Sequence, residues 1–515
     1  MCFREMTAKT VPLLLFQQSP SFAMATSSPP STPDTSSEEW PLAPTTTSGG
    51  ARNGDDLCAI YVHAGAGYHS PQNQRAHLEA CNDAAKVAMA LLKSGASAVD
   101  AVEMAVRLME DREITNAGFG SNLTIDGKVE CDATIVDYLG RSGAVGACPN
   151  VKNPISAARA VLEYQKERLS LRRTPPNLLV GIGAAEFAYD RGVSLVKDDY
   201  LISQPARARW LRWKHKLDLL RQKEQEDSGH FGDVESSEDD EDVRARVESL
   251  RMDAAESTPP KSATTAEASS SGKATSESTQ LAECSCLKAD ARLDPLSKGP
   301  SSRLNVTPSS GLAVLNNPGE RQINETGNEP VDDITDTVGA IAVDSRGHIA
   351  AGSSSGGIGL KSRGRIGPAA LVNIGTAVIP ADPGDPDQVS VATVTSGTGE
   401  HIITTSAAAI CANRIYRIGE SATNEPVMEE EILKRVIERD FMEHPGVKSS
   451  HCEASIGVLA VKRTSDGIYF WFCHNSDSFA VAAMNSRDTK PVCVMSRRSR
   501  HGSTAQGGRA FIYPQ

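Results

Sequence analysis

The stretch DTVGAIAVD, residues 336–344, decides the fold of this chain. Val338, Ala340 and Ala342 alternate along it, which is the period-two pattern of a buried β-strand. The strand begins directly after a long polar stretch, and the residue before its first apolar position is Thr337. A cut at this point would leave the fold intact, because a strand is held by its ladder while the end of a linker can move away.

A cut before Thr337 would create a group that can activate the threonine hydroxyl. A hydroxyl is a weak nucleophile unless a base lies beside it. The α-amino group of the same residue can be that base, since its unperturbed pKa of about 7.7 to 8.0 is close to the working pH. The amine exists only if the chain is cleaved between Asp336 and Thr337. From the residues alone an ordinary strand after a loop is the alternative, because many strands begin after loops.

Composition limits the class of protein. The chain has 515 residues, with 39% hydrophobic and 5% aromatic residues, values that indicate a disordered fraction beside a normal core. The net charge of −12 argues against direct nucleic-acid binding by the chain as a whole. The 11 cysteines form no CxxC pair, which is typical of reduced thiols in an intracellular protein. No apolar run is long enough for a transmembrane helix, so we expect no membrane association.

The chain divides into four parts. Residues 1–55 are rich in Ser, Thr and Pro and are predicted to be a disordered leader. Residues 56–222 mix strand and helix patterns. Residues 223–333 are acidic and of low complexity, so we expect an exposed linker rather than part of a core. Order returns at residue 337 and continues to 515 in a part rich in antiparallel hairpins.

Periodicity predicts the main elements. Helices are expected over 71–94, from an N-cap at Ser97 to Glu110, and over 154–169, 184–191 and 429–441. A hairpin is expected around Asp126-Gly127. Strands and helices therefore alternate in both halves, which predicts an α+β fold. No dinucleotide-binding motif, P-loop or zinc-binding pattern is present.

The segment before the linker has its own pattern. Residues 207–223 carry many Arg and Lys residues, and Trp210, Trp213, Leu217 and Leu220 share one helical face. One interpretation is an amphipathic helix packed on the domain. The other is a nuclear-import or partner-binding segment, since basic clusters serve that role.

Eight short motifs, in this order, resemble the type-2 asparaginase family of N-terminal-nucleophile hydrolases. The motifs are HAGAGYHS (63–70), TNAGFGSNL (115–123), ECDATIVD (130–137), GAVGA (143–147), KNPISAA (152–158), DTVGAIAVD (336–344), SSSGGIGLKSRGRIG (353–367) and TSGTGEHI (395–402). The resemblance implies a four-layer αββα sandwich and self-cleavage between Asp336 and Thr337. It also implies that the two resulting parts stay associated and that such αβ units pair into a dimer.

The same resemblance assigns roles to residues. Thr337 is the expected nucleophile and its freed amine the base, and Ser355 is the second hydroxyl that supports it. Arg365 is expected to hold a substrate carboxylate, which suits the bidentate geometry of a guanidinium. The remaining expected site residues are Ser396 and Gly397 at the oxyanion site, Asn116 as a positioning group, and Gly65 and Gly67, which let backbone approach the cleft. No cofactor and no catalytic metal are expected. Taken singly, Ser355 is better explained as a turn residue and Arg365 as a solvated charge, but taken together in this order the motifs favour the family roles.

One departure from the family pattern concerns the substrate. Relatives that act on asparagine carry a carboxylate three residues after the arginine, where it binds a free α-amino group, and this chain has Pro368 there. A site without that carboxylate is suited to an aspartate inside a peptide. Within the family, the motifs together most closely resemble the threonine aspartase branch, proteases that cut after aspartate, and Pro368 agrees with this resemblance.

This resemblance implies protein substrates with an internal aspartate, among them nuclear regulators, and a location in the nucleus and cytoplasm. Two alternatives stay open: an asparaginase or β-aspartyl peptidase that acts on small molecules, and an unprocessed interaction protein.

Overall fold

The computed structural model describes residues 57–228, 337–417, 429–499 and 503–513. The predicted leader, residues 1–55, the predicted linker beyond residue 228 and Asp336, at the predicted cleavage site, lie outside the described residues. The described ranges all belong to one unit, Asp56–Gln515.

The strand predicted after Thr337 lies in the middle of an eight-stranded sheet. This strand, β5, runs from Val338 to Val343 and is buried along its whole length. The order in the sheet is β12-β11-β1-β5-β6-β2-β3-β4, and only the β3–β4 pair is parallel. The other strands of this large sheet are β1 (Ala59–Gly67), β2 (Cys131–Val136), β3 (Ser142–Cys148), β4 (Leu178–Val180), β6 (Ile349–Ser355), β11 (Ser478–Asn485) and β12 (Val492–Arg497). A central strand needs neighbours on both sides, so both halves of the sequence contribute to the sheet.

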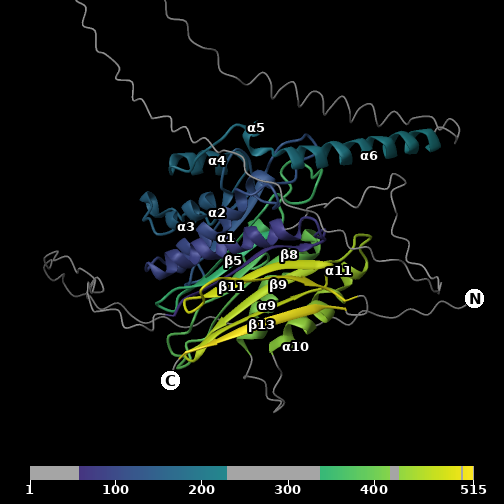
Figure 1. Cartoon of the computed structure of the whole chain (residues 1–515). Coiled ribbons are helices and arrows are strands. Elements are labelled where there is room, and N and C mark those ends of the chain that lie inside the picture. The colour runs from purple at the N-terminus through teal and green to yellow at the C-terminus, as the bar shows by residue number, and fades with distance from the viewer. Residues whose placement is uncertain (1–56, 229–336, 418–428, 500–502, 514–515) are drawn as a thin grey trace, which may run out of the picture. The chain divides into compact units, whose positions relative to one another are not determined.

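Helices cover the outer face of the large sheet (Figure 1). They are α1 (Gln74–Lys93), α2 (Ala98–Glu110) and α3 (Pro154–Tyr164). Their alanine-rich apolar faces pack on one side of the strands and form a continuous buried cluster. The N-cap predicted at Ser97 is confirmed: its side chain accepts the Asp100 backbone N–H, and the Asp100 side chain accepts the Ser97 N–H. This capping box fixes the start of α2.

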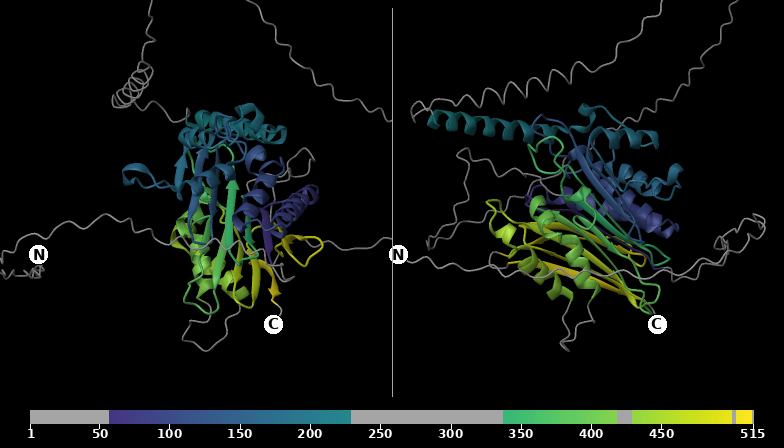
Figure 2. Two further views of the ribbon diagram at one scale, coloured as in Figure 1. Left: turned by 90° about the vertical axis from the view of Figure 1, so that its left-hand side faces the viewer. Right: turned by 180° about the vertical axis from the view of Figure 1, so that it is seen from behind.

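A second sheet of five strands packs on the other face, in the order β13-β10-β9-β8-β7. Aromatic and branched side chains from both sheets, such as Tyr61 and Phe470, form the core between them. Its strands are β7 (Thr376–Ile379), β8 (Ser390–Gly397), β9 (Ile456–Arg463), β10 (Gly467–His474) and β13 (Ala505–Ile512). Helices α9 (Ala407–Tyr416) and α10 (Glu429–Arg435) pack on its outer face around a third cluster (Figure 2).

The remaining described elements are short, apart from α6. They are α4 (Gly181–Asp190), α5 (Asp198–Leu201), α6 (Gln204–Ser228), α8 (Gly399–Thr405) and α11 (Pro445–Lys448), the 3-10 turns Gly118–Gly120, Ser170–Arg172 and Pro368–Ala370, and the π-helical turn Val436–Phe441 that extends α10. Within the described ranges, no helix combines the length and apolarity that a membrane span requires.

Several sequence predictions need correction. The turn at Asp126-Gly127 forms, but no strands flank it; the paired strands are β2 and β3, which come later. Thr124 instead forms an isolated bridge with Lys361, a partner far away in the sequence. The helix predicted over 154–169 ends at Tyr164. Strand β13 was not predicted, because its glycines hide the period-two pattern that marks a strand.

Helix α6 continues past the boundary predicted at residue 222 and ends at Ser228. Only its first half packs on the domain. Trp210 donates its indole N–H to the Thr124 carbonyl at 2.9 Å, and the Trp213 ring occupies the space that a Cβ at Gly359 would need. Leu220, predicted on the same face, is 57% exposed. The amphipathic interpretation therefore holds for the first turns of this helix only.

Candidate active site

Strand register determines the surroundings of Thr337. In the β5–β6 pair Val338 lies opposite Ser354, and in the β1–β5 pair His63 lies opposite Gly339. Continuing the β5–β6 ladder by one residue places Thr337 opposite Ser355, while the β1–β5 ladder ends at His63. Thr337 is 8% exposed, so it lies at the rim of the core rather than inside it.

Ser396 joins Thr337 to strand β1. Its Oγ accepts the backbone N–H of Thr337 at 3.2 Å and the backbone N–H of Ala66 at 3.0 Å. A hydroxyl has two acceptor lone pairs, so these bonds fill its acceptor capacity and leave its proton free to donate elsewhere. Ser396 comes from β8 of the second sheet, and its bonds therefore cross from one sheet to the other at the end of the strands.

Ser355 begins a turn that a second predicted residue holds in place. Its Oγ accepts the Gly357 N–H at 3.0 Å. The Asn116 side chain donates to the Gly357 carbonyl at 2.8 Å, and the Asn116 carbonyl accepts the Gly356 N–H at 2.8 Å. Asn116 is buried, and within the described residues its side chain bonds to Gly357 and Asn122 rather than to Thr337. Its geometry is that of a group that fixes the turn after Ser355.

Arg365 lies in a slot formed by glycines. A Cβ added at Gly357 or Gly367 would lie 2.8 Å from its Nη1, and one added at Gly399 would lie 2.6 Å from its Nη2. The guanidinium therefore fits only because three neighbouring residues have no side chain. Gly357 also has a φ of +71°, a conformation that other residues adopt at a cost.

Two functional candidates were missed by sequence reasoning. Glu400, at the first turn of α8, accepts hydrogen bonds from Arg365 Nε at 3.0 Å and Nη2 at 2.8 Å. Asp132, on β2, accepts the Ala147 N–H and the Gly367 N–H, each at 2.8 Å. Asp132 lies in the motif ECDATIVD and Glu400 in the motif TSGTGEHI. The sequence of a motif does not show which residue an acidic side chain in it will contact.

Asp132 anchors the loop that carries Arg365. It lies opposite Ser355 in the β2–β6 ladder, and its bond to Gly367 ties residues 361–367 to the large sheet. Burial raises the pKa of its carboxyl, and the positive charges of Lys361 and Arg365 and both backbone bonds act in the opposite direction. Lys361 is itself buried and donates its Nζ to the Glu130 carbonyl.

His63 lies opposite Gly339, close to Thr337, and is fully buried. Burial lowers its pKa to about 3, only partly offset by a backbone hydrogen bond of Thr337, so the ring is neutral at physiological pH. The imidazole fills the space beside Gly339, where a Cβ would lie 2.4 Å from Nε2. It therefore packs under the strand that begins at Thr337, and a cationic role is excluded by its burial.

The remaining predicted glycines differ in their surroundings. Gly65 has a φ of +110° and lies in the irregular step of β1 between His63 and Ala66, which turns the strand toward Ser396. Gly397 has a φ of +139°, and a Cβ there would lie 2.2 Å from the Ser455 carbonyl oxygen. Gly67 lies in the ladder with Ser478, whose hydroxyl donates to its carbonyl at 3.1 Å. Gly67 thus faces strand β11 rather than Thr337.

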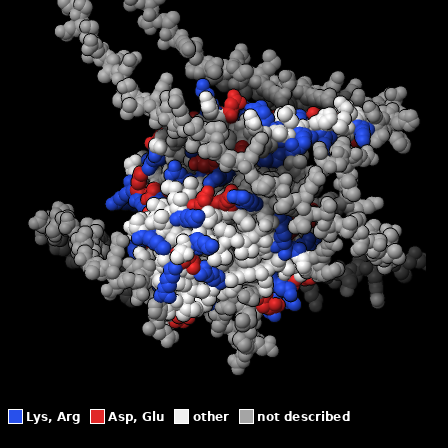
Figure 3. Space-filling view, viewed as in Figure 1, with Lys and Arg blue, Asp and Glu red and all other residues white. Residues whose placement is uncertain are grey.

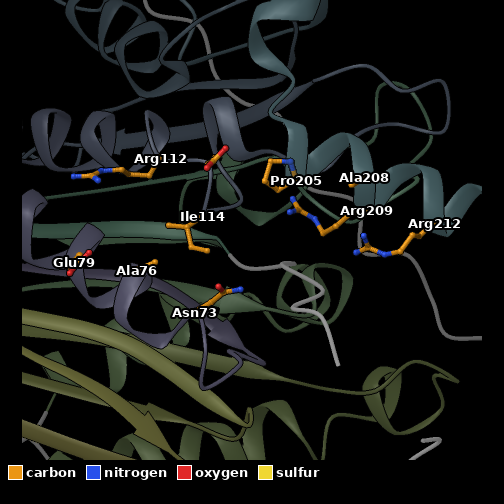
Figure 4. Close-up of a pocket in the computed structure, with 10 residues that line it drawn as sticks. Asn73, Ala76, Glu79, Arg112, Ile114, Pro205, Ala208, Arg209 and Arg212 are labelled. Carbon is orange, nitrogen blue, oxygen red and sulfur yellow. The ribbon is translucent and has the colours of Figure 1, made fainter. Parts of the chain in front are cut away.

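A separate pocket of about 480 Å³ lies between α1, the loop after α2 and the start of α6 (Figure 4). None of the predicted site residues lines it. Two of its three arginines have partners: Arg112 pairs with Asp83 at 2.5 Å, and Arg209 donates to the Gly120 carbonyl at 3.1 Å. Across the described ranges, no cluster of His, Cys, Asp and Glu is large enough to hold a metal ion.

Comparison with known proteins gives a consistent picture. The family model described as asparaginase matches residues 57–254 and 303–481. The isoaspartyl peptidase/L-asparaginase of Danio rerio is 40% identical over 157 residues, which cover 30% of this chain and 47% of the relative. The plant-type L-asparaginase of Pyrococcus abyssi is 41% identical over 163 residues, 31% of this chain and 49% of the relative.

The isoaspartyl peptidase/L-asparaginase of Rattus norvegicus is 38% identical over 152 residues, 29% of this chain and 43% of the relative. The matched segments thus span less than half the length of these curated relatives. The family model covers most of the residues that the structure describes, including the strand that begins after Thr337. The chain therefore belongs to the type-2 asparaginase family of N-terminal-nucleophile hydrolases.

Proposed function

We propose that the chain is a threonine endopeptidase of the threonine aspartase type, which cleaves itself between Asp336 and Thr337 and then cleaves other proteins after aspartate. The observation that carries the proposal is the position of Thr337 at the start of the central strand, with its backbone nitrogen on Ser396. Cleavage there would turn that nitrogen into an α-amine while β5 stays held by β1 and β6.

The freed amine would then be oriented for its task. One N–H donates to Ser396 Oγ, which fixes the amine beside the hydroxyl of its own residue. The amine takes the proton of the Thr337 hydroxyl as the oxygen attacks the peptide carbonyl carbon. The same proton passes to the leaving amine, an ester joins Thr337 to the aspartyl residue, and water hydrolyses that ester to free the enzyme.

Arg365 would hold the side-chain carboxylate of the substrate aspartate. Its guanidinium is partly accessible, with the side chain 14% exposed, and a fork of this kind binds a carboxylate bidentately. Ser355, Ser396 and Gly397 would complete the site around the reacting carbonyl. The proposed four-layer αββα arrangement is supported by the helices on the outer faces of both sheets.

Pro368 favours a peptide substrate over a free amino acid. It is buried beside the guanidinium slot, where a Cβ at Gly399 would lie 3.1 Å from its Cδ. The nearby carboxylate of Asp132 already accepts two backbone N–H groups. Pro368 has no charge that could pair with a free α-ammonium group, which fits an acylated aspartate.

A second candidate function is hydrolysis of asparagine or β-aspartyl dipeptides. It is favoured by the relatives, whose names are isoaspartyl peptidase/L-asparaginase and plant-type L-asparaginase. Both functions use the same nucleophile and the same arginine, and they differ in which carboxylate the arginine holds. Activity toward an aspartate-containing peptide, compared with activity toward asparagine or a β-aspartyl dipeptide, therefore distinguishes the two functions.

The basic half of α6 supports a proposed nuclear role. Lys and Arg side chains gather along this helix at the upper right of Figure 3. Its exposed Arg207, Arg212 and Lys216 would be available to an import receptor or an acidic partner. Nuclear protein substrates, a lasting association of the two chain parts and pairing of αβ units are part of the same proposal. An unprocessed interaction protein would use this helix without any cleavage at Thr337.

The first experiment follows self-cleavage. Purified protein is incubated, separated by denaturing electrophoresis, and the smaller fragment is sequenced from its N-terminus. The proposal expects a new terminus at Thr337 in the wild type and a single intact chain for Thr337→Ala. A wild-type chain that stays intact after long incubation contradicts it and leaves the interaction protein.

The second experiment identifies the substrate. Processed protein is offered peptides that contain an internal aspartate, the same peptides with asparagine in its place, free L-asparagine and a β-aspartyl dipeptide. Cleavage after aspartate alone supports the endopeptidase. Efficient release of ammonia or of aspartate from the small substrates, with intact peptides, supports the asparaginase instead.

A further inference from the structure

We propose that Glu400 is a positioning residue that holds the Arg365 guanidinium so that its Nη1–Nη2 edge stays available to the substrate carboxylate. This inference rests on the proposed use of Arg365 as the group that binds a carboxylate. It adds a specificity-determining residue that no motif of the sequence singled out.

The hydrogen bonds divide the guanidinium into two edges. A single oxygen, Glu400 Oε1, accepts from both Nε and Nη2 of Arg365. This contact occupies the edge formed by Nε and Nη2. The other edge, formed by Nη1 and the second N–H of Nη2, has no hydrogen-bond partner in the part of the chain that the structure describes. A carboxylate can take two parallel N–H groups there.

The slot limits where the guanidinium can move but does not fix its rotation. Gly357 and Gly367 lie beside Nη1, and Gly399 lies beside Nη2. These three glycines leave space for the guanidinium because they have no side chain. They limit its position but form no hydrogen bond with it. Glu400 is the only hydrogen-bond partner of this side chain among the described residues. It therefore decides which edge of the guanidinium stays available to a ligand.

Placement on α8 suits this role. Glu400 follows Gly399 at the first turn of the helix, where a carboxylate is favoured by the backbone N–H groups. Its side chain is 56% exposed, against 14% for Arg365. An exposed ion pair of this kind contributes little to folding stability, so its removal should affect ligand binding more than folding.

The size of the effect follows from the cost of ordering a side chain. Immobilising one flexible side chain on binding costs about 0.5 to 1.5 kcal/mol, which corresponds to about two- to tenfold in a dissociation constant. Without Glu400 the Arg365 side chain becomes ordered only when substrate binds, so this cost weakens substrate binding. A competing arrangement, in which Glu400 blocks Arg365 until substrate displaces it, predicts the opposite sign.

The test uses processed protein and a product-like probe. Calorimetry measures binding of N-acetyl-L-aspartate and of N-acetyl-L-asparagine, which lacks the side-chain carboxylate. The wild type should prefer the aspartate. Glu400→Ala should reduce that preference by about two- to tenfold, and Glu400→Gln, which keeps an oxygen acceptor, should retain part of it. Glu443→Ala is the matched control, since Glu443 is an exposed glutamate outside the site.

Cleavage kinetics give a second readout. With an aspartate-containing peptide, Glu400→Ala should raise KM and leave kcat nearly unchanged, whereas a general structural defect would lower kcat as well. The proposal is overturned if Glu400→Ala tightens or does not alter binding of N-acetyl-L-aspartate, or if the wild type shows no preference for it. If the preference depends on Glu400 but no peptide is cleaved after aspartate, the proposed protease function fails and this inference stands.

Discussion

Replacing Ser396 by alanine should weaken both the fold and the reaction at the same point. The Ser396 hydroxyl accepts the Ala66 N–H at 3.0 Å and the Thr337 N–H at 3.2 Å, and it is 1% exposed. Alanine removes the acceptor and leaves the shape of the backbone unchanged. Water cannot easily replace the hydroxyl, because Ala66 is also buried.

The magnitude follows from the two N–H groups that lose their partner. A buried donor without an acceptor costs about 1 to 3 kcal/mol, and this full cost applies to Ala66. Thr337 is 8% exposed and lies at the rim, so its share is nearer to about 1 kcal/mol, the net value of an ordinary hydrogen bond. Ser396→Ala should therefore lower the free energy of unfolding by about 2 to 4 kcal/mol.

Urea denaturation of processed protein measures this loss, and the midpoint should fall while the slope stays constant. The activity of folded protein should fall at least about tenfold in kcat, since the amine loses the bond that orients it. Thr134→Val is the matched control, because it also removes a buried strand hydroxyl.

Two results would refute the reasoning. A change in the free energy of unfolding below about 0.5 kcal/mol would mean that the Ser396 hydroxyl makes no net contribution to folding stability. An unchanged kcat in folded, processed protein would mean that the amine is oriented by some other group. Either result would remove Ser396 from the account of the site.

Three further predictions concern the slot and the core. Gly357→Ala should raise KM for an aspartate peptide, because φ is +71° and the new Cβ would meet Arg365 Nη1 at 2.8 Å; an unchanged KM in a folded variant argues against the slot. Burial raises the pKa of Glu110 to about 8 in the folded protein. The free energy of unfolding should therefore be greatest below the unfolded pKa near 4.5 and fall as pH rises toward 8. Glu110→Gln should flatten this dependence on pH, and parallel denaturation profiles for the two proteins would contradict the prediction. Thr134→Val should raise the free energy of unfolding by about 1 kcal/mol, since Thr134 Oγ1 is buried with no hydrogen-bond partner among the described residues; a clear loss of stability would show that the hydroxyl is bonded in solution.

Local signals predicted much of this structure because they depend on neighbouring residues. The capping box at Ser97 and the strand at Val338 were predicted from short patterns, and the structure confirms both. The end of the helix after Pro154 and the flanks of the Asp126-Gly127 turn were predicted wrongly. In both places, contacts from distant parts of the chain decide the conformation, as the bridge from Thr124 to Lys361 shows.

By itself the sequence determined which residues begin the central strand and which motifs surround a candidate nucleophile. Only the tertiary structure decided which partner each side chain has. Ser396 reaches Thr337 because two sheets pack face to face, and Glu400 reaches Arg365 because the start of α8 lies against the loop that follows β6. Periodicity records which face of an element is buried, but a hydrogen bond between residues far apart in the chain depends on how the layers pack, and no local pattern encodes it.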